Sequence, residues 1–171
     1  NQKMVHYSPF NGKVEEGILF TDTGFWDTFR SLFPFLTLMY PEMDRQMMQG
    51  MVNTYKESGW LPEWATPGHR ATMVGSNSAS VITDAYTKGI RGFDINTLYE
   101  ALMKNTEQQG PLNTLGRNGV KEYNTLGYVP VDKYGGSAAK TLEFAYADFC
   151  LRNLSTLLKK PEDQIKKFEQ R

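Results

Sequence analysis

The spacing of apolar residues predicts a chain that is helical from Phe25 onward. The clearest segment follows Asp94, a residue type suited to cap a helix N-terminus. Its apolar residues recur at the i, i+3, i+4, i+7 and i+8 positions of one helix face: Ile95, Leu98, Tyr99, Leu102 and Met103. The same reading predicts helices over 28–39 with a break or kink at Pro34, from Pro41, over 78–88, over 137–160 and from Pro161. Residues 1–22 are predicted to be extended, and a short strand at 18–21 and a short helix near 119–125 also fit.

The predicted helices alternate in character. Those after Pro41, Asp94 and Pro161 carry one apolar stripe, as expected for helices that face water on one side. The helix over 137–160 carries two stripes, one with Leu142, Ala145 and Phe149 and the other with Phe144, Ala147, Leu151, Leu154 and Leu158. A helix that is apolar on two sides is expected to be buried on two sides. This helix and the one over 78–88 therefore predict an inner layer covered by an outer layer.

The predicted loops alternate as well. Long segments rich in Gly and aromatic residues, 59–77 and 105–136, lead into the predicted inner helices, whereas the other links are short. In an antiparallel array all these long loops lie at one end, where long structured loops are usually functional. Paired inner and outer helices describe an α/α toroid or an α-solenoid. No repeat consensus is present, which favours the toroid.

Composition narrows the function classes. The 171 residues suffice for one domain, and 19 Lys plus Arg against 19 Asp plus Glu give a net charge of zero, which argues against a nucleic-acid partner. No apolar run is long enough for a membrane span. The single cysteine, Cys150, excludes an intramolecular disulfide, and two histidines, His6 and His69, make a histidine-based metal site improbable. Aromatic residues make up 13% of the chain, a surplus that often lines carbohydrate sites.

The first candidate cluster is Trp26, Asp27 and Arg30 at the start of a predicted inner helix. A Trp ring can stack on the apolar face of a sugar while a neighbouring carboxylate accepts hydrogen bonds from its hydroxyls. The alternative is that Asp27 caps the helix and pairs with Arg30 while Trp26 fills the core.

The second candidate cluster lies in the Pro/Gly-rich loop 59–77, where Trp60 and Trp64 flank Glu63 and His69 follows. It fits an aromatic-walled sugar subsite, and it equally fits a packed loop whose Trp residues cover the inner helices. Asn77 is placed to point at a ligand or to act as an ordinary cap. Further candidates are Asp84, a carboxylate that needs a partner if buried, and a rim formed by Tyr128, Val129, Pro130 and Asp132.

Six segments taken together resemble glycoside hydrolase family 92, whose members are exo-acting α-mannosidases, α-1,2-mannosidases among them. They are FWDTFR (25–30), PFLTL (34–38), GWLP (59–62), VITDAYTKGI (81–90), LGYVP (126–130) and KTLEFAYADFC (140–150). Each segment alone is a weak signal, but their joint occurrence in the family's order is specific. The resemblance runs from about Tyr7 to the end of the chain.

The resemblance implies a β-sandwich domain followed by an (α/α)6 toroid, with the active site between them. It implies a calcium-dependent, inverting enzyme that removes terminal α-linked mannose from glycans, located in the periplasm or outside a bacterial cell. The chain is then an extended N-terminal segment, 1–24, and the first half of the all-α toroid, 25–171. Its partners are the remaining half of the toroid, the β-sandwich domain and a mannose-terminated glycan.

An inverting enzyme needs an acid and a base about 6.5–9.5 Å apart, and no such pair can be assigned here. Both are expected beyond Arg171, together with the calcium ligands, so this chain alone is expected to be inactive; Glu63 is the fallback acid. The predicted substrate-binding residues are Trp26, Asp27, Arg30, Trp60, Glu63, Trp64, His69 and Asn77. The alternatives are a non-catalytic carbohydrate-binding or helical scaffold protein, and an α/α-toroid polysaccharide lyase with His69 or Tyr128 as its base.

Overall fold

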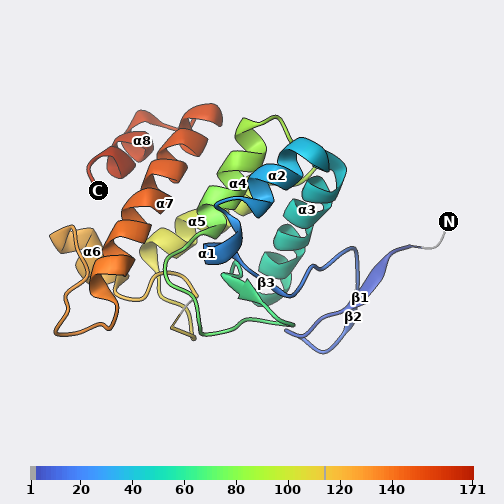
Figure 1. The fold of residues 1–171 in the computed structure, drawn as a ribbon, viewed down its shortest axis with the longest axis horizontal. Helices are drawn as coiled ribbons and strands as arrows, with labels where there is room; N and C mark the ends of the chain where they lie inside the picture. The colour runs from blue at the N-terminus through green and yellow to red at the C-terminus, as the bar shows by residue number, and fades with distance from the viewer. Residues whose placement is uncertain (1–2, 114) are drawn as a thin grey trace.

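The computed structural model describes residues 3–113 and 115–171 and is mostly helical (Figure 1). The strands are β1 (Val5–Tyr7), β2 (Val14–Glu16), β3 (Thr23–Gly24) and β4 (Trp64–Ala65). The helices are α1 (Phe25–Thr28), α2 (Leu32–Met39), α3 (Pro41–Ser58), α4 (Ser78–Thr87), α5 (Ile95–Glu107), α6 (Val120–Leu126), α7 (Ser137–Leu157) and α8 (Glu162–Glu169). β1 pairs with β2 and β3 with β4, both antiparallel. In the described residues no helix is long and apolar enough to cross a membrane.

The helices form two layers, as the alternating stripes predict. In the inner layer α4 packs between α2 and α7. In the outer layer α3, α5 and α8 each pack on the inner helix that precedes them in the chain. Both long loops lie at one end of this array, at the bottom of Figure 1, and the short links lie at the other. The prediction that the long loops converge is therefore confirmed.

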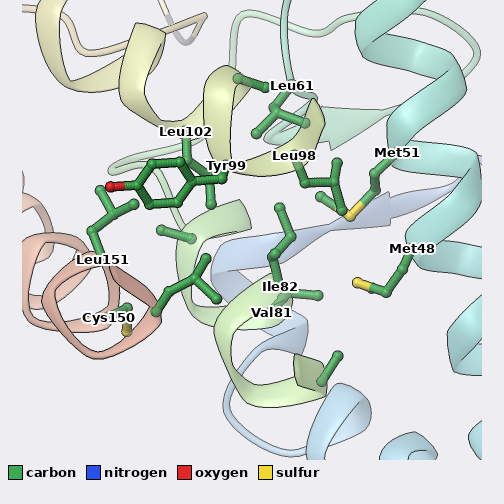
Figure 2. Close-up of a cluster of buried hydrophobic side chains, with 14 of the residues drawn as sticks. Met48, Met51, Leu61, Val81, Ile82, Leu98, Tyr99, Leu102, Cys150 and Leu151 are labelled. Atoms are coloured by element: carbon green, nitrogen blue, oxygen red, sulfur yellow. The ribbon is translucent and has the colours of Figure 1, made fainter. Parts of the chain in front are cut away.

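The core lies where α3, α4, α5 and α7 meet (Figure 2). The stripe predicted for α5 supplies Leu98 and Leu102, which pack with Met48 of α3 and Ile82 of α4, and all four are fully buried. Each such side chain stabilises the fold by about 1.5–3 kcal/mol relative to an exposed one. Asp94 caps α5, because its Oδ1 accepts a 3.1 Å hydrogen bond from the backbone N–H of Thr97.

Two predicted helix boundaries are wrong. The helix predicted over 28–39 is two helices, α1 and α2, and the break precedes Pro34 instead of falling on it. Pro34 lies in the first turn of α2, where an N–H would have no partner within the helix. The helix predicted to reach residue 160 ends at Leu157, because Lys159 adopts a left-handed backbone with φ of 53°. The segment 18–21 is irregular, and the hairpin of β1 and β2 precedes it.

The prediction that the helix over 137–160 is buried on two sides is also wrong for this chain. The stripe of α7 that contains Phe144 and Leu151 is buried in the core, whereas Leu142 on the other stripe is 72% exposed. The face of α2 at the opposite edge of the inner layer is similar, since Leu38 is 78% exposed. The inner layer thus ends in a largely exposed apolar face at both edges.

Candidate functional site

Trp26 and Arg30 meet a glutamate of α7 at the end of the array that carries the long loops. The indole Nε1 of Trp26 donates a 3.0 Å hydrogen bond to Glu143 Oε1, and Nη2 of Arg30 lies 3.4 Å from the same oxygen. The Arg30 guanidinium also lies over the Trp26 ring, 4.8 Å from its centroid. Trp26 remains 38% exposed, so one part of its ring is open to a ligand. The arrangement is a stacking platform held by a carboxylate and a guanidinium.

Asp27 lies in the first turn of α1 and is exposed. The predicted alternative in which Asp27 caps the helix and pairs with Arg30 is wrong, because Gly24 occupies the cap position and Arg30 pairs with Glu143. Strand β3 pairs Gly24 with Trp64 of β4, which brings the long loop 59–77 to the start of α1. A Cβ added at Gly24 would lie 3.2 Å from Asp27 Oδ2 and 2.9 Å from the Trp64 ring. The structure therefore brings Asp27, the residue that follows Trp26 in the chain, together with Trp64 beside Gly24.

Trp60 lies apart from this platform, packed between the two long loops. A Cβ added at Gly110 or Gly116 would meet its ring at 3.1 or 2.9 Å. On the other side Lys104 Nζ lies 4.2 Å from the ring centroid and donates a 2.7 Å hydrogen bond to the carbonyl of Gly59. These contacts match the packed-loop alternative for this Trp.

Glu63 is 1% exposed and holds the N-terminus of α4. It accepts a 3.1 Å hydrogen bond from the backbone N–H of Ser78 and a 2.6 Å bond from Ser78 Oγ. Burial raises the pKa of Glu63 to about 8, although the Ser78 bonds and the charge of Arg117 act against that rise. An acid with this pKa would suit proton donation. The carboxylate is nevertheless enclosed by protein, which gives the fallback assignment no support from geometry.

Arg117 forms the centre of a buried polar cluster with Glu63. It is fully buried, its Nε donates a 3.2 Å hydrogen bond to Ser76 Oγ, and its Nη2 lies 2.6 Å from Oδ1 of Asp148 on α7. Tyr123 of α6 donates a 3.2 Å hydrogen bond to the other oxygen of Asp148. The cluster ties both long loops to α4 and α7.

The remaining candidates are placed as follows. His69 is half-buried, its Nε2 lies 2.9 Å from Ser58 Oγ, and burial lowers the pKa of its imidazole to about 4. Asn77 is buried and donates a 2.9 Å hydrogen bond to the carbonyl of Val74. Asp84 is half-buried and its Oδ2 lies 2.7 Å from Lys88 Nζ. Tyr128 is exposed at the rim near the start of α7. Because Nε2 of His69 is within hydrogen-bond distance of Ser58 Oγ, nothing in this geometry favours His69 as a lyase base.

Sequence reasoning missed Glu143. It lies 117 residues from Trp26, so no local motif joins the two residues. The available signal was weak: a carboxylate between the two apolar stripes of a predicted inner helix, within one of the six family-like segments. Among the described residues no three His, Cys, Asp or Glu side chains come together as a metal site would require.

The geometry is that of a helical array with an aromatic and carboxylate platform at one end, which is typical of carbohydrate-active domains. The model of the glycosyl hydrolase family 92 catalytic domain matches residues 1–171, so the chain belongs to glycoside hydrolase family 92. The six segments quoted above therefore identify the family correctly.

Solved structures of the family resemble this one closely. An inverting family 92 mannosidase of Bacteroides thetaiotaomicron is 43% identical with a TM-score of 0.94, over 98% of this chain and 23% of that one. A family 92 α-mannosidase of the same organism is 30% identical with a TM-score of 0.82, over 96% of this chain and 22% of that one. The latter has also been solved in complex with mannoimidazole.

A curated relative, described as an uncharacterized secreted glycosidase of the fungus Arthroderma benhamiae, is 33% identical over 125 residues. The alignment covers 67% of this chain and 16% of the relative. The chain thus spans less than a quarter of the length of each of these relatives.

Proposed function

We propose that the full-length protein carrying this chain is an exo-acting α-mannosidase that removes terminal α-linked mannose, α-1,2-linked in particular, from glycans with inversion and calcium dependence. The observation that carries the proposal is the exposed Trp26, held by Glu143 and Arg30 at the loop-bearing end of a family 92 array, with the exposed Asp27 next to it in the chain. A Trp ring stacks on the apolar face of a sugar, and a carboxylate accepts hydrogen bonds from its hydroxyls. Trp64 extends the same surface.

The chain's contribution is to bind the sugar, and other parts of the protein supply the rest. The general acid, the general base and the calcium ligands come from outside this chain, and the chain by itself is inactive. The apolar faces left at α2 and α7, together with the quarter or less of each solved relative that is matched, support further helices completing the toroid and a β-sandwich domain beside it. We retain the division into segment 1–24 and half-toroid 25–171. A location outside the cytoplasm is supported by the relative described as secreted.

The test uses the full-length protein with an α-1,2-linked mannobiose, followed by proton NMR. We expect β-mannose as the first product, because an inverting enzyme delivers water to the face opposite the leaving group. Removal of divalent cations by a chelator should abolish the activity, and Ca²⁺ should restore it. Absence of released mannose would overturn the proposal. Mannose binding by calorimetry without release would instead favour the non-catalytic carbohydrate-binding protein.

A second experiment tests the division of labour. The 171-residue chain, shown to be folded by circular dichroism, should release no product from an aryl α-mannoside. Turnover that is abolished by Glu63→Gln would contradict this expectation and make Glu63 the catalytic acid.

A further inference from the structure

Glu143 connects three separate parts of the chain at the platform. Its side chain on α7 is 16% exposed, and its Oε1 contacts both Trp26 and Arg30. The loop that precedes α4 packs against it as well, since a Cβ added at Gly75 would lie only 2.8 Å from Glu143 Cβ. Gly75 has φ of 83°, so the loop approaches Glu143 with a backbone conformation that favours glycine. The loop backbone thus packs against the base of the Glu143 side chain, and the carboxylate at its tip reaches the platform.

The contact to Trp26 fixes a ring that would otherwise rotate. An indole has a single N–H donor, and a bond from that donor to a carboxylate selects one orientation of the ring plane. The same carboxylate oxygen attracts Arg30, whose guanidinium also lies over the faces of Trp26 and Phe29. A ring and a cation that are already oriented lose less freedom when a sugar stacks on them.

We propose that Glu143 is a positioning residue that sets the orientation of the Trp26 ring for a sugar bound on the platform. This inference rests on the proposed function. In this role Glu143 orients the Trp26 ring and does not itself contact the reacting atoms. Its effect is transmitted through Trp26, so it should disappear when the indole N–H is absent.

The kinetic test compares Glu143→Ala with Glu143→Gln in the full-length protein, with an aryl α-mannoside as substrate. Glu143→Ala removes the acceptor, and we expect KM to rise about tenfold with kcat within threefold of the wild type, the size of one lost charged hydrogen bond. Glu143→Gln keeps an acceptor oxygen for the indole, so we expect its KM to stay within about threefold of the wild-type value. In a Trp26→Phe background, Glu143→Ala should raise KM by less than about a further threefold, because the hydrogen bond between the indole and Glu143 is already missing. Glu169→Ala, which breaks the exposed pair with Arg152 on α8, is the matched control and should leave KM unchanged.

A spectroscopic readout separates this inference from the proposed function. In protein labelled with 5-fluorotryptophan, the Trp26 resonance is the one that Trp26→Phe removes. We expect Glu143→Ala to shift and broaden this resonance, Glu143→Gln to shift it less, and Glu169→Ala to leave it in place. An unchanged resonance in Glu143→Ala, or full additivity with Trp26→Phe, would overturn the positioning role. A wild-type protein that releases no mannose would overturn the proposed function, and the fluorine spectra would still report whether Glu143 orients the ring.

Discussion

Asp44 offers the sharpest test of the physical reasoning, because it is a fully buried carboxylate without a partner. It lies in the first turn of α3, and among the described residues neither of its oxygens has a hydrogen-bond partner. Burial raises the pKa of Asp44 from its ordinary 3.8 to about 6, the charge of Asp84 raises it further, and Lys88 lowers it. The neutral form of this side chain is therefore the one that suits the fold.

The sign of the pH dependence follows from that rise. Because the pKa is higher in the folded than in the unfolded state, the folded state binds the proton more tightly. The corresponding stability is fully present below about pH 3.8 and is lost as pH rises through about 6. This rise in pKa corresponds to at most about 3 kcal/mol in the free energy of unfolding. That stability is lost as pH rises through the window.

The perturbation is Asp44→Asn, which keeps the shape of the side chain and removes its charge. We expect the variant to be more stable than the wild type by about 1–3 kcal/mol at pH 8 and equal to it or less stable at pH 4.5. The assay is urea unfolding of both proteins, followed by circular dichroism at several pH values. Asp163→Asn is the matched control, since Asp163 is an exposed aspartate in the first turn of α8, and we expect its difference from wild type to stay within about 0.5 kcal/mol.

The result that would refute this reasoning is a constant difference between Asp44→Asn and the wild type at every pH. A constant difference would mean that Asp44 keeps the same proton affinity in the folded and unfolded states. A variant less stable than the wild type at pH 8 would also refute it, because the charge would then be stabilising the fold.

Three further predictions concern the site and the cluster beneath it. In the full-length protein Asp27→Ala should lower kcat/KM by roughly tenfold to several hundredfold with little change in melting temperature; unchanged kinetics with a lowered melting temperature would make Asp27 a purely structural residue. Arg117→Met should lower the free energy of unfolding by about 3–5 kcal/mol in urea, because it leaves Asp148 buried and unpaired, and a loss below about 1 kcal/mol would contradict that. Since the pKa of Glu63 rises from 4.5 to about 8, wild-type stability should fall between these pH values, and Glu63→Gln should gain stability relative to it over that range in thermal melts.

The sequence predicts elements well where the information is local. The cap at Asp94 and the stripe through Leu98 and Leu102 define α5 without reference to any other part of the chain, and the structure confirms both. The two stripes of α7 are also visible in the sequence, and they show that both faces are apolar. They do not show what covers each face, because that depends on elements far away in the sequence or outside this chain.

The candidate site divides in the same way. Trp26 and Asp27 are adjacent in sequence, so a local pattern finds them, whereas Glu143 joins them only through the packing of α7 against the start of α1. Trp60 and Glu63 carry the same residue types in a Pro/Gly-rich loop. Such a pattern fits a sugar subsite and a packed loop equally well, and only the burial of Glu63 and the contacts of Trp60 distinguish the two.

The buried ion pair of Arg117 and Asp148 explains how the two long loops, 59–77 and 105–136, can support a binding surface. Burying Arg117 and Asp148 is costly unless the two are brought together, since each charge needs the other once water is removed. Arg117 lies in the loop before α6, Asp148 lies on α7, and Ser76, which accepts a hydrogen bond from Arg117, lies in the loop before α4. The two loops are therefore ordered together with α7 or not at all. Glu143 lies on the same helix as Asp148, so the cluster that orders the loops also fixes the helix from which the platform is held.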